Sequence, residues 1–136
     1  PMKEEIKTYV QNAKLGKHIL FTGFIDQIPE VLQELNIFLM TSKTEGLGTS
    51  VLDAFASGLP VISTNGGGLK ETVFHNETGL SANVGDSETL AGHVVQLMQD
   101  DTKRNDLAQS ALQFVQQFSK QNTAKRTYQI YQDLVS

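Results

Sequence analysis

One acidic residue lies in a glycine-rich turn, and a second lies in the helix that is expected to follow this turn. Glu45 lies in the turn, directly before Gly46 and Gly48, and Asp53 lies within the expected helix. A helix N-terminus that follows glycines presents free backbone N–H groups and a positive dipole end, which suit a phosphate. Carboxylates accept hydrogen bonds from the hydroxyls of a sugar or a ribose. This spacing therefore predicts a sugar-nucleotide site.

The helix geometry supports this prediction but leaves a simpler interpretation open. At about 100° per residue, a narrow polar stripe collects Thr49, Ser50, Asp53 and Ser57, while apolar residues fill the rest of the helix. An ordinary amphipathic helix with a solvated stripe has the same pattern. Three further glycines at residues 66–68 either approach a ligand closely or simply end the preceding strand.

The elements that must position these residues alternate between strand and helix. The hydrophobic periodicity predicts helices over 3–15, 27–35, 49–57, 69–74, 87–99, 102–118 and 121–135, with strands over 18–22, 36–41, 60–63 and 79–82. Either Asp86 or Ser87 is expected to cap helix 87–99, and Tyr128 and Tyr131 are expected to pack in the core. Strands that alternate with helices predict an α/β fold with a Rossmann-like parallel sheet of about four strands, flanked by helices.

Several ordered blocks along the chain resemble one enzyme family, the group 1 retaining glycosyltransferases with the GT-B type fold. That family carries the pattern E-x(7)-E, and here Glu45 matches the first acid while Asp53 replaces the second glutamate. Gly67, Gly68 and Glu71 match a later GG-x-x-E turn. Further matching blocks are ASGLPVIST, HILFTGFI upstream and GDSETLAGHVVQLMQDD downstream. The resemblance covers nearly the whole chain.

The resemblance implies a domain assignment and an activity. Residues 1–136 would form a single domain, the second half of the C-terminal, nucleotide-sugar-binding domain of such an enzyme. The full enzyme would transfer a hexose from a nucleoside diphosphate sugar to an acceptor with retention of the anomeric configuration. The acceptor would be bound through an N-terminal domain that this chain lacks, so the fragment alone is expected to be inactive.

The resemblance also assigns site residues. Glu45 would be the catalytic residue that binds the donor sugar, and Asp53 would bind the ribose. The other donor-binding residues would be Gly46, Leu47, Gly48 and Thr49 at the helix start, and Gly23 and Phe24, with Thr22, around the base. The donor is a substrate, so no cofactor is expected. His18, His75 and His93 lack metal-ligand spacing, and no metal is expected.

Composition limits the remaining function classes. The chain has 136 residues, no cysteine and a formal net charge of −4, which argue against a disulfide framework, a thiolate metal site and nucleic-acid binding. A cytoplasmic location is expected, with the parent enzyme peripheral at the inner membrane face. Two alternatives remain: a nucleotide-sugar epimerase of the same architecture, and a non-catalytic nucleotide-binding module.

One expected strand raises a question about association. The strand over residues 18–22 is apolar on both faces, and its partner strand would lie outside this chain. An unprotected strand edge exposes a row of N–H and C=O groups that can pair with another chain. The sequence therefore predicts self-association through residues 18–22, either edge to edge between two copies or by exchange of elements. The alternative is a monomer in which helix 3–15 or the C-terminal helix covers this edge.

Overall fold

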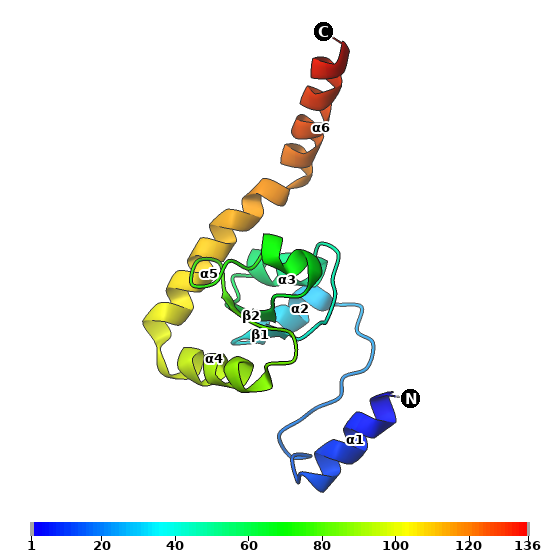
Figure 1. Ribbon diagram of the computed structural model, residues 1–136, viewed down its shortest axis with the longest axis vertical. Helices are drawn as coiled ribbons and strands as arrows, with labels where there is room; N and C mark the ends of the chain where they lie inside the picture. Colours follow the sequence, from blue (N-terminus) through cyan, green and yellow to red (C-terminus); the bar gives the residue numbers. More distant parts are fainter. Residues whose placement is uncertain (1, 136) are drawn as a thin grey trace.

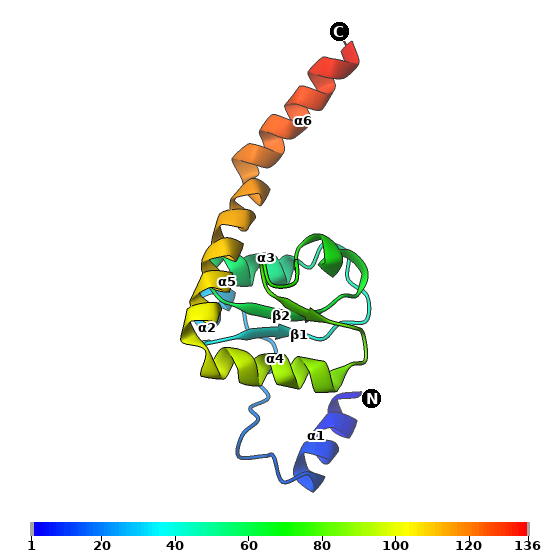
Figure 2. The same ribbon diagram turned by 60° about the vertical axis from the view of Figure 1, so that its left-hand side comes forward.

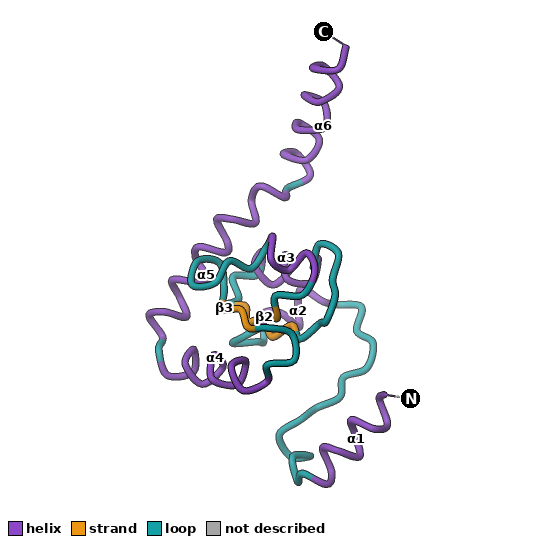
Figure 3. The backbone as a smooth tube through the Cα atoms, in the orientation of Figure 1, coloured by secondary structure: helices purple, strands orange, loops and turns teal. Residues whose placement is uncertain are grey.

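A parallel β-sheet forms the centre of the protein, whose computed structural model describes residues 2–135. Strands β1 (Phe38–Met40), β2 (Val61–Thr64) and β3 (Leu80–Ala82) lie in the order β1-β2-β3. Figure 3 shows β2 and β3 in orange, with helices around them. Both strand pairs are parallel, with Leu39 opposite Ile62 and Ser63 opposite Ser81. The expected α/β class is confirmed, although the sheet has three strands rather than about four.

Helices cover both faces of this sheet. Helix α3 (Thr49–Ala56) lies on one face and α4 (Ser87–Gln99) on the other, as Figure 2 shows. The remaining elements are α1 (Met2–Asn12), α2 (Ile28–Gln33), η1 (Gly67–Glu71), α5 (Asp101–Val115), η2 (Gln116–Phe118) and α6 (Lys120–Val135). The expected helix over 87–99 is confirmed at both ends, and the Asp86 carboxylate caps it by accepting the Thr89 N–H at 3.0 Å.

Two apolar clusters hold the helices on the sheet. On the α3 side, Val51 and Phe55 pack with Val61 and Leu69, and each of them is fully buried. On the α4 side, Ile62 packs with a cluster that includes Leu80, Ala82, Leu90, Leu97 and Leu107. All residues of β2 are buried, as expected for a central parallel strand covered on both faces. The sheet and α3 therefore form the packed centre of the fold.

The strand expected over residues 18–22 does not form. This segment is an irregular coil between α1 and α2, and its side chains are exposed, with Leu20 at 85%. A strand needs a neighbour to take up its N–H and C=O groups. Within the described residues, β1 pairs with β2 alone and the coil pairs with no strand, so the apolar run has nothing to order it.

The two terminal helices extend away from the sheet (Figure 1). Helix α6 continues beyond η2 into solvent, and Tyr128 and Tyr131 are 63% and 66% exposed. Their expected place in the core is therefore wrong, because α6 meets no surface of the described chain that could cover them. Within residues 2–135, every helix is too short or too polar to cross a bilayer.

Candidate functional site

Two loops meet at the carboxyl edge of the sheet: residues 41–48 follow β1, and residues 65–68 follow β2 and lead into η1, which begins at Gly67. The backbone N–H of Gly68 donates to the carbonyl of Glu45 at 2.9 Å. A Cβ on Gly66 would meet the carbonyl oxygen of Lys43, one on Gly67 would meet the Glu45 backbone, and one on Gly68 would meet the Gly46 carbonyl oxygen. The three glycines thus let the two loops touch backbone to backbone.

Glu45 is half-buried between these loops, and its carboxylate has a partner within its own loop. The hydroxyl of Ser42 donates to Glu45 Oε1 at 2.7 Å. The Thr64 hydroxyl, buried at the end of β2, donates to the Ser42 carbonyl at 2.5 Å. Ser42 and Thr64 were not predicted from the sequence. The pattern S-x-x-E at residues 42–45 would not have predicted this contact, because in a capping box each side chain bonds the other residue's backbone N–H at a helix start, whereas here the hydroxyl donates to the carboxylate within a loop.

The start of α3 presents a run of free donors. Gly48 precedes the helix with φ of 70°, a left-handed conformation that favours glycine, and Leu69 packs against it. Within residues 2–135, the N–H groups of residues 46–50 donate to no other group of the chain. These are the predicted donor-binding residues Gly46, Leu47, Gly48 and Thr49, together with Ser50. With the helix dipole, the run can bind an anion such as a phosphate.

Asp53 lines a cavity of about 450 Å³ beside the same helix. The coil before α2 contributes Thr22, Gly23 and Phe24 to its lining, and α3 contributes Ser50. The remaining walls are apolar, formed by Ile25, Ile28, Val31, Leu32, Leu35, Phe38 and Met40. The structure therefore brings Gly23 and Phe24 together with Asp53, even though residues 18–22 are not a strand. An apolar hollow with a carboxylate at its rim suits a flat base joined to a hydroxylated sugar.

The predicted residues do not all line one cavity. Glu45 lies outside the lining of the hollow that holds Asp53. A second cavity of about 360 Å³, between α3 and η2, is lined by Thr49 and Asp53 with Ser119. Asp53 thus borders hollows on two sides of α3, while Glu45 stands before the N-terminus of that helix.

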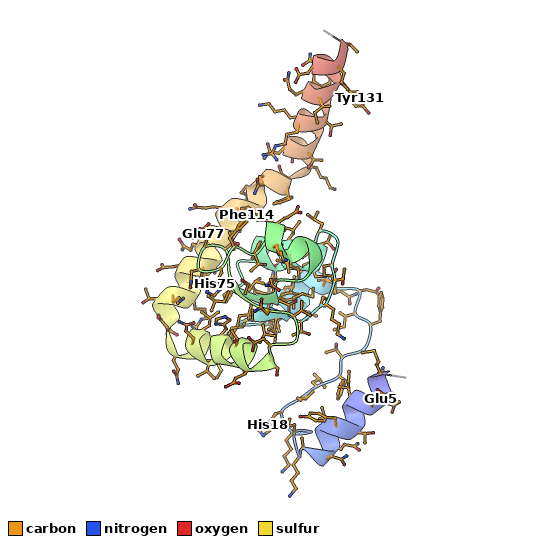
Figure 4. All side chains as sticks on the ribbon, in the orientation of Figure 1. Glu5, His18, His75, Glu77, Phe114 and Tyr131 are labelled. Atoms are coloured by element: carbon orange, nitrogen blue, oxygen red, sulfur yellow. The ribbon has the colours of Figure 1, made fainter. Side chains whose placement is uncertain are left out.

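A hollow larger than both of these lies elsewhere. A cavity of about 710 Å³ is lined by Glu77, Asp100, Lys103 and Asp106 with neighbouring residues of the loop before β3 and of α5. Figure 4 shows Glu77 near α5. Ligands of open parallel sheets bind outside the carboxyl ends of the strands, whereas this hollow adjoins the amino end of β3. We therefore assign the candidate site to the loops after β1 and β2.

Two histidines cover the outer edge of β3. His75 Nδ1 accepts the Ser81 N–H at 3.0 Å, and His93 Nε2 lies 3.3 Å from the Ser81 carbonyl oxygen. Burial lowers the pKa of His75, and the nearby His93 and Lys103 lower it further. The rings thus contact the backbone of Ser81 on the outer side of β3, where the described residues place no further strand. Among the described residues, no three His, Cys, Asp or Glu side chains gather to hold a metal ion.

Comparisons with known proteins agree on one family. The family model described as "Glycosyl transferases group 1" matches residues 1–114. The chain is 31% identical over 127 residues to N-acetyl-alpha-D-glucosaminyl L-malate synthase of Bacillus anthracis, covering 93% of this chain and 33% of that protein. It is 32% identical over 109 residues to D-inositol 3-phosphate glycosyltransferase of Corynebacterium urealyticum, covering 80% of this chain and 26% of that protein. The chain thus spans about a third of the length of such relatives or less.

Solved structures show the same fold. The C-terminal domain of a group 1 family glycosyl transferase, LpcC of Francisella tularensis, is 32% identical with a TM-score of 0.78, over 85% of this chain and 60% of that one. HepE of Anabaena, solved in complex with UDP and glucose, is 25% identical with a TM-score of 0.86, over 97% of this chain and 36% of that one. Both similarities extend over most of the elements described above.

Proposed function

Because the chain belongs to the group 1 glycosyl transferases, we propose that it is the donor-binding part of a transferase. The whole enzyme transfers a hexose from a nucleoside diphosphate sugar to an acceptor and retains the anomeric configuration. Residues 1–136 are a partial C-terminal domain of that enzyme, and the acceptor binds through an N-terminal domain. The observation that carries this proposal is the run of free N–H groups at residues 46–50, between Glu45 and Asp53.

Each part of the donor has a binding place either on this run or beside it. The diphosphate binds the backbone N–H groups of Gly46, Leu47, Gly48 and Thr49. The ribose hydroxyls donate to Asp53, and the base enters the apolar hollow beside Gly23 and Phe24. The crystal structure of Anabaena HepE with UDP-glucose supports this type of ligand for the fold, at 25% identity. The sugar then extends toward Glu45.

The chemistry follows from where charge develops. The bond between the anomeric carbon and the diphosphate oxygen breaks, and the acceptor oxygen bonds to that carbon while its proton passes to the departing diphosphate oxygen. Negative charge grows on the leaving diphosphate, where fixed N–H groups and the dipole of α3 stabilise it. Glu45 binds the donor-sugar hydroxyls and holds the anomeric carbon in the reacting geometry. This chain alone, without the acceptor domain, is inactive.

Three further properties belong to the same proposal. The full-length enzyme is cytoplasmic and binds peripherally to the inner face of the membrane. The isolated chain self-associates through the exposed apolar segment 18–22. Transfer is favoured over epimerisation, because the Corynebacterium urealyticum relative is named a glycosyltransferase and the Francisella tularensis structure is that of a group 1 glycosyl transferase.

A panel of donors tests the proposal. The full-length protein is incubated with UDP-glucose, UDP-N-acetylglucosamine and GDP-mannose, and release of the nucleoside diphosphate is measured with and without a candidate acceptor. We expect acceptor-dependent release from one donor, with the product anomer matching the donor anomer. Interconversion of free nucleotide sugars would instead support the epimerase. Binding without turnover for every acceptor would support a non-catalytic module, and no binding of any donor would refute the site.

A further inference from the structure

The carboxylate of Glu45 is held on one side only. Ser42 donates to its Oε1 at 2.7 Å, which is within the range of short hydrogen bonds to a charged acceptor. Among the described residues, no group donates to its Oε2. One carboxylate oxygen is thus occupied by the protein and the other is available to a ligand.

The Ser42 hydroxyl has two candidate acceptors but a single proton. Met40 Sδ lies 3.4 Å from the same oxygen. A thioether is a weak hydrogen-bond acceptor, whereas a carboxylate is a strong one. The Ser42 hydroxyl therefore donates its hydrogen bond to Glu45 rather than to Met40. Met40 Sδ then remains a neighbour of the hydroxyl oxygen without taking its hydrogen bond. The Ser42 hydroxyl therefore binds the Glu45 side chain rather than Met40, the last residue of β1.

Ser42 is itself fixed from the sheet. The hydroxyl of Thr64, which is 1% exposed, donates to the Ser42 carbonyl at 2.5 Å. The backbone of Glu45 is fixed separately, because Gly68 donates to its carbonyl. A chain of contacts thus runs from the buried end of β2 through Ser42 to one oxygen of the Glu45 side chain.

We propose that Ser42 is a positioning residue: it holds the Glu45 carboxylate in one rotamer, with Oε2 directed to a hydroxyl of the donor sugar. This inference rests on the proposed function of Glu45. Without the serine, the carboxylate samples other rotamers and must be ordered in each reaction. The effect falls on the reacting geometry more than on the affinity for the nucleotide, which the helix start and Asp53 bind.

Steady-state kinetics of the full-length enzyme test this role. Ser42→Ala should lower kcat about 10-fold, as expected for one hydrogen bond, while the donor KM changes less than about two-fold. Ser42→Thr keeps the hydroxyl and should restore most of kcat. Ser87→Ala, at an exposed serine that begins α4, is the matched control and should behave as the wild type. In a Glu45→Ala background, Ser42→Ala should have no further effect, because the two residues act as a unit.

Two outcomes of these experiments would contradict the positioning role. Equal losses in Ser42→Ala and Ser42→Thr would show that the site needs a small side chain rather than a hydroxyl. A full additional loss in the Glu45→Ala background would show that Ser42 acts independently of Glu45. Crystal structures of the variants give a readout that needs no activity, since the Glu45 rotamer should change in Ser42→Ala and return in Ser42→Thr. If the wild type turns over no donor while these rotamers behave as expected, the proposed function fails and the positioning of Glu45 stands.

Discussion

Gly68 donates its backbone N–H to the carbonyl of Glu45, and no Cβ fits at Gly68 because the Gly46 carbonyl occupies that space. The position of the candidate catalytic residue is therefore set by a glycine on another loop, after the next strand of the sheet. A side chain at residue 68 would separate the loops that carry the site.

Gly68→Ala should destabilise the protein by about 2–3 kcal/mol, because a methyl group forced against backbone cannot be accommodated by a side-chain rotation. Donor affinity should fall as well, since the loop of residues 41–48 must move. Thermal unfolding and donor binding measure the two effects. Gly92→Ala is the matched control, because a Cβ there meets nothing within 4 Å and lies in helix α4. Equal stability of the two variants would contradict the contact between the loops.

Asp53→Ala in the full-length enzyme should raise the donor KM roughly 10-fold, because an exposed carboxylate loses its hydrogen bonds to the ribose. The change in kcat should be small, since these contacts differ little between the ground and transition states. Asp106→Ala, in the hollow of about 710 Å³, serves as the control and should leave the donor KM unchanged. A larger effect at Asp106 than at Asp53 would move the donor site to the amino edge of the sheet.

Glu45→Gln should lower kcat on the order of 100-fold, because the neutral amide no longer interacts with the donor sugar as a carboxylate does. Donor KM should change much less than kcat. Steady-state rates with saturating donor measure the loss, and Glu77→Gln, on the loop before β3, is the control. A donor KM that rises while kcat stays at the wild-type value would assign Glu45 to simple donor binding.

Lowering the pH should destabilise the fold through His75. Its pKa is lowered in the folded state, chiefly by burial and then by His93 and Lys103, so the folded protein favours the neutral ring. This stabilisation is complete above the unfolded value of about 6.5 and is lost as the pH falls through the folded pKa. Protonation of Nδ1 also breaks the hydrogen bond from Ser81.

The measurement is the melting temperature between pH 7.5 and 5. The wild type should lose stability more steeply on acidification than His75→Gln, whose amide oxygen can accept the Ser81 N–H without titrating. Identical pH profiles would show that the ring does not protect the edge of β3.

The isolated chain should self-associate at micromolar concentration, because the coil before α2 exposes Leu20 at 85% and Phe24 at 92%. Leu20→Glu should reduce the apparent mass in light scattering. Tyr131→Glu, on the exposed face of α6, is the control and should leave the mass unchanged. A monomeric wild type, or dissociation by the α6 variant instead, would contradict association through residues 18–22.

The features predictable from the sequence are those with local causes. The glycines and the apolar pattern that follows them predicted the turn before α3. Asp86, one of the two cap residues considered for helix 87–99, could be recognised from its position before that helix. The apolar run at residues 18–22 has the composition of a strand, but its formation depends on a partner that no local signal supplies. Likewise, the spacing of Tyr128 and Tyr131 on α6 suits burial only where another surface covers that face.

The residues of the candidate site likewise fall into those that could be predicted from the sequence and those that could not. The sequence pointed to Glu45, Asp53 and the glycines through a resemblance, and the structure places Gly23 and Phe24 around one hollow with Asp53. It did not point to the contact between residues 43–46 and 66–68, because a run of glycines is equally compatible with a turn, a ligand or another backbone. Nor did it identify Thr64, whose bond to Ser42 joins residues far apart in the sequence.

Loops that meet without intervening side chains have little room to rearrange. The loops after β1 and β2 become ordered when the sheet folds, so a ligand that binds at the start of α3 does not have to immobilise them. Binding there should then carry a small loss of conformational entropy, in contrast to the exposed coil at residues 22–24, which must settle onto its ligand. If the proposed donor binds here, the carboxyl edge of this sheet would offer a preorganised half to the phosphates and an adaptable half to the base.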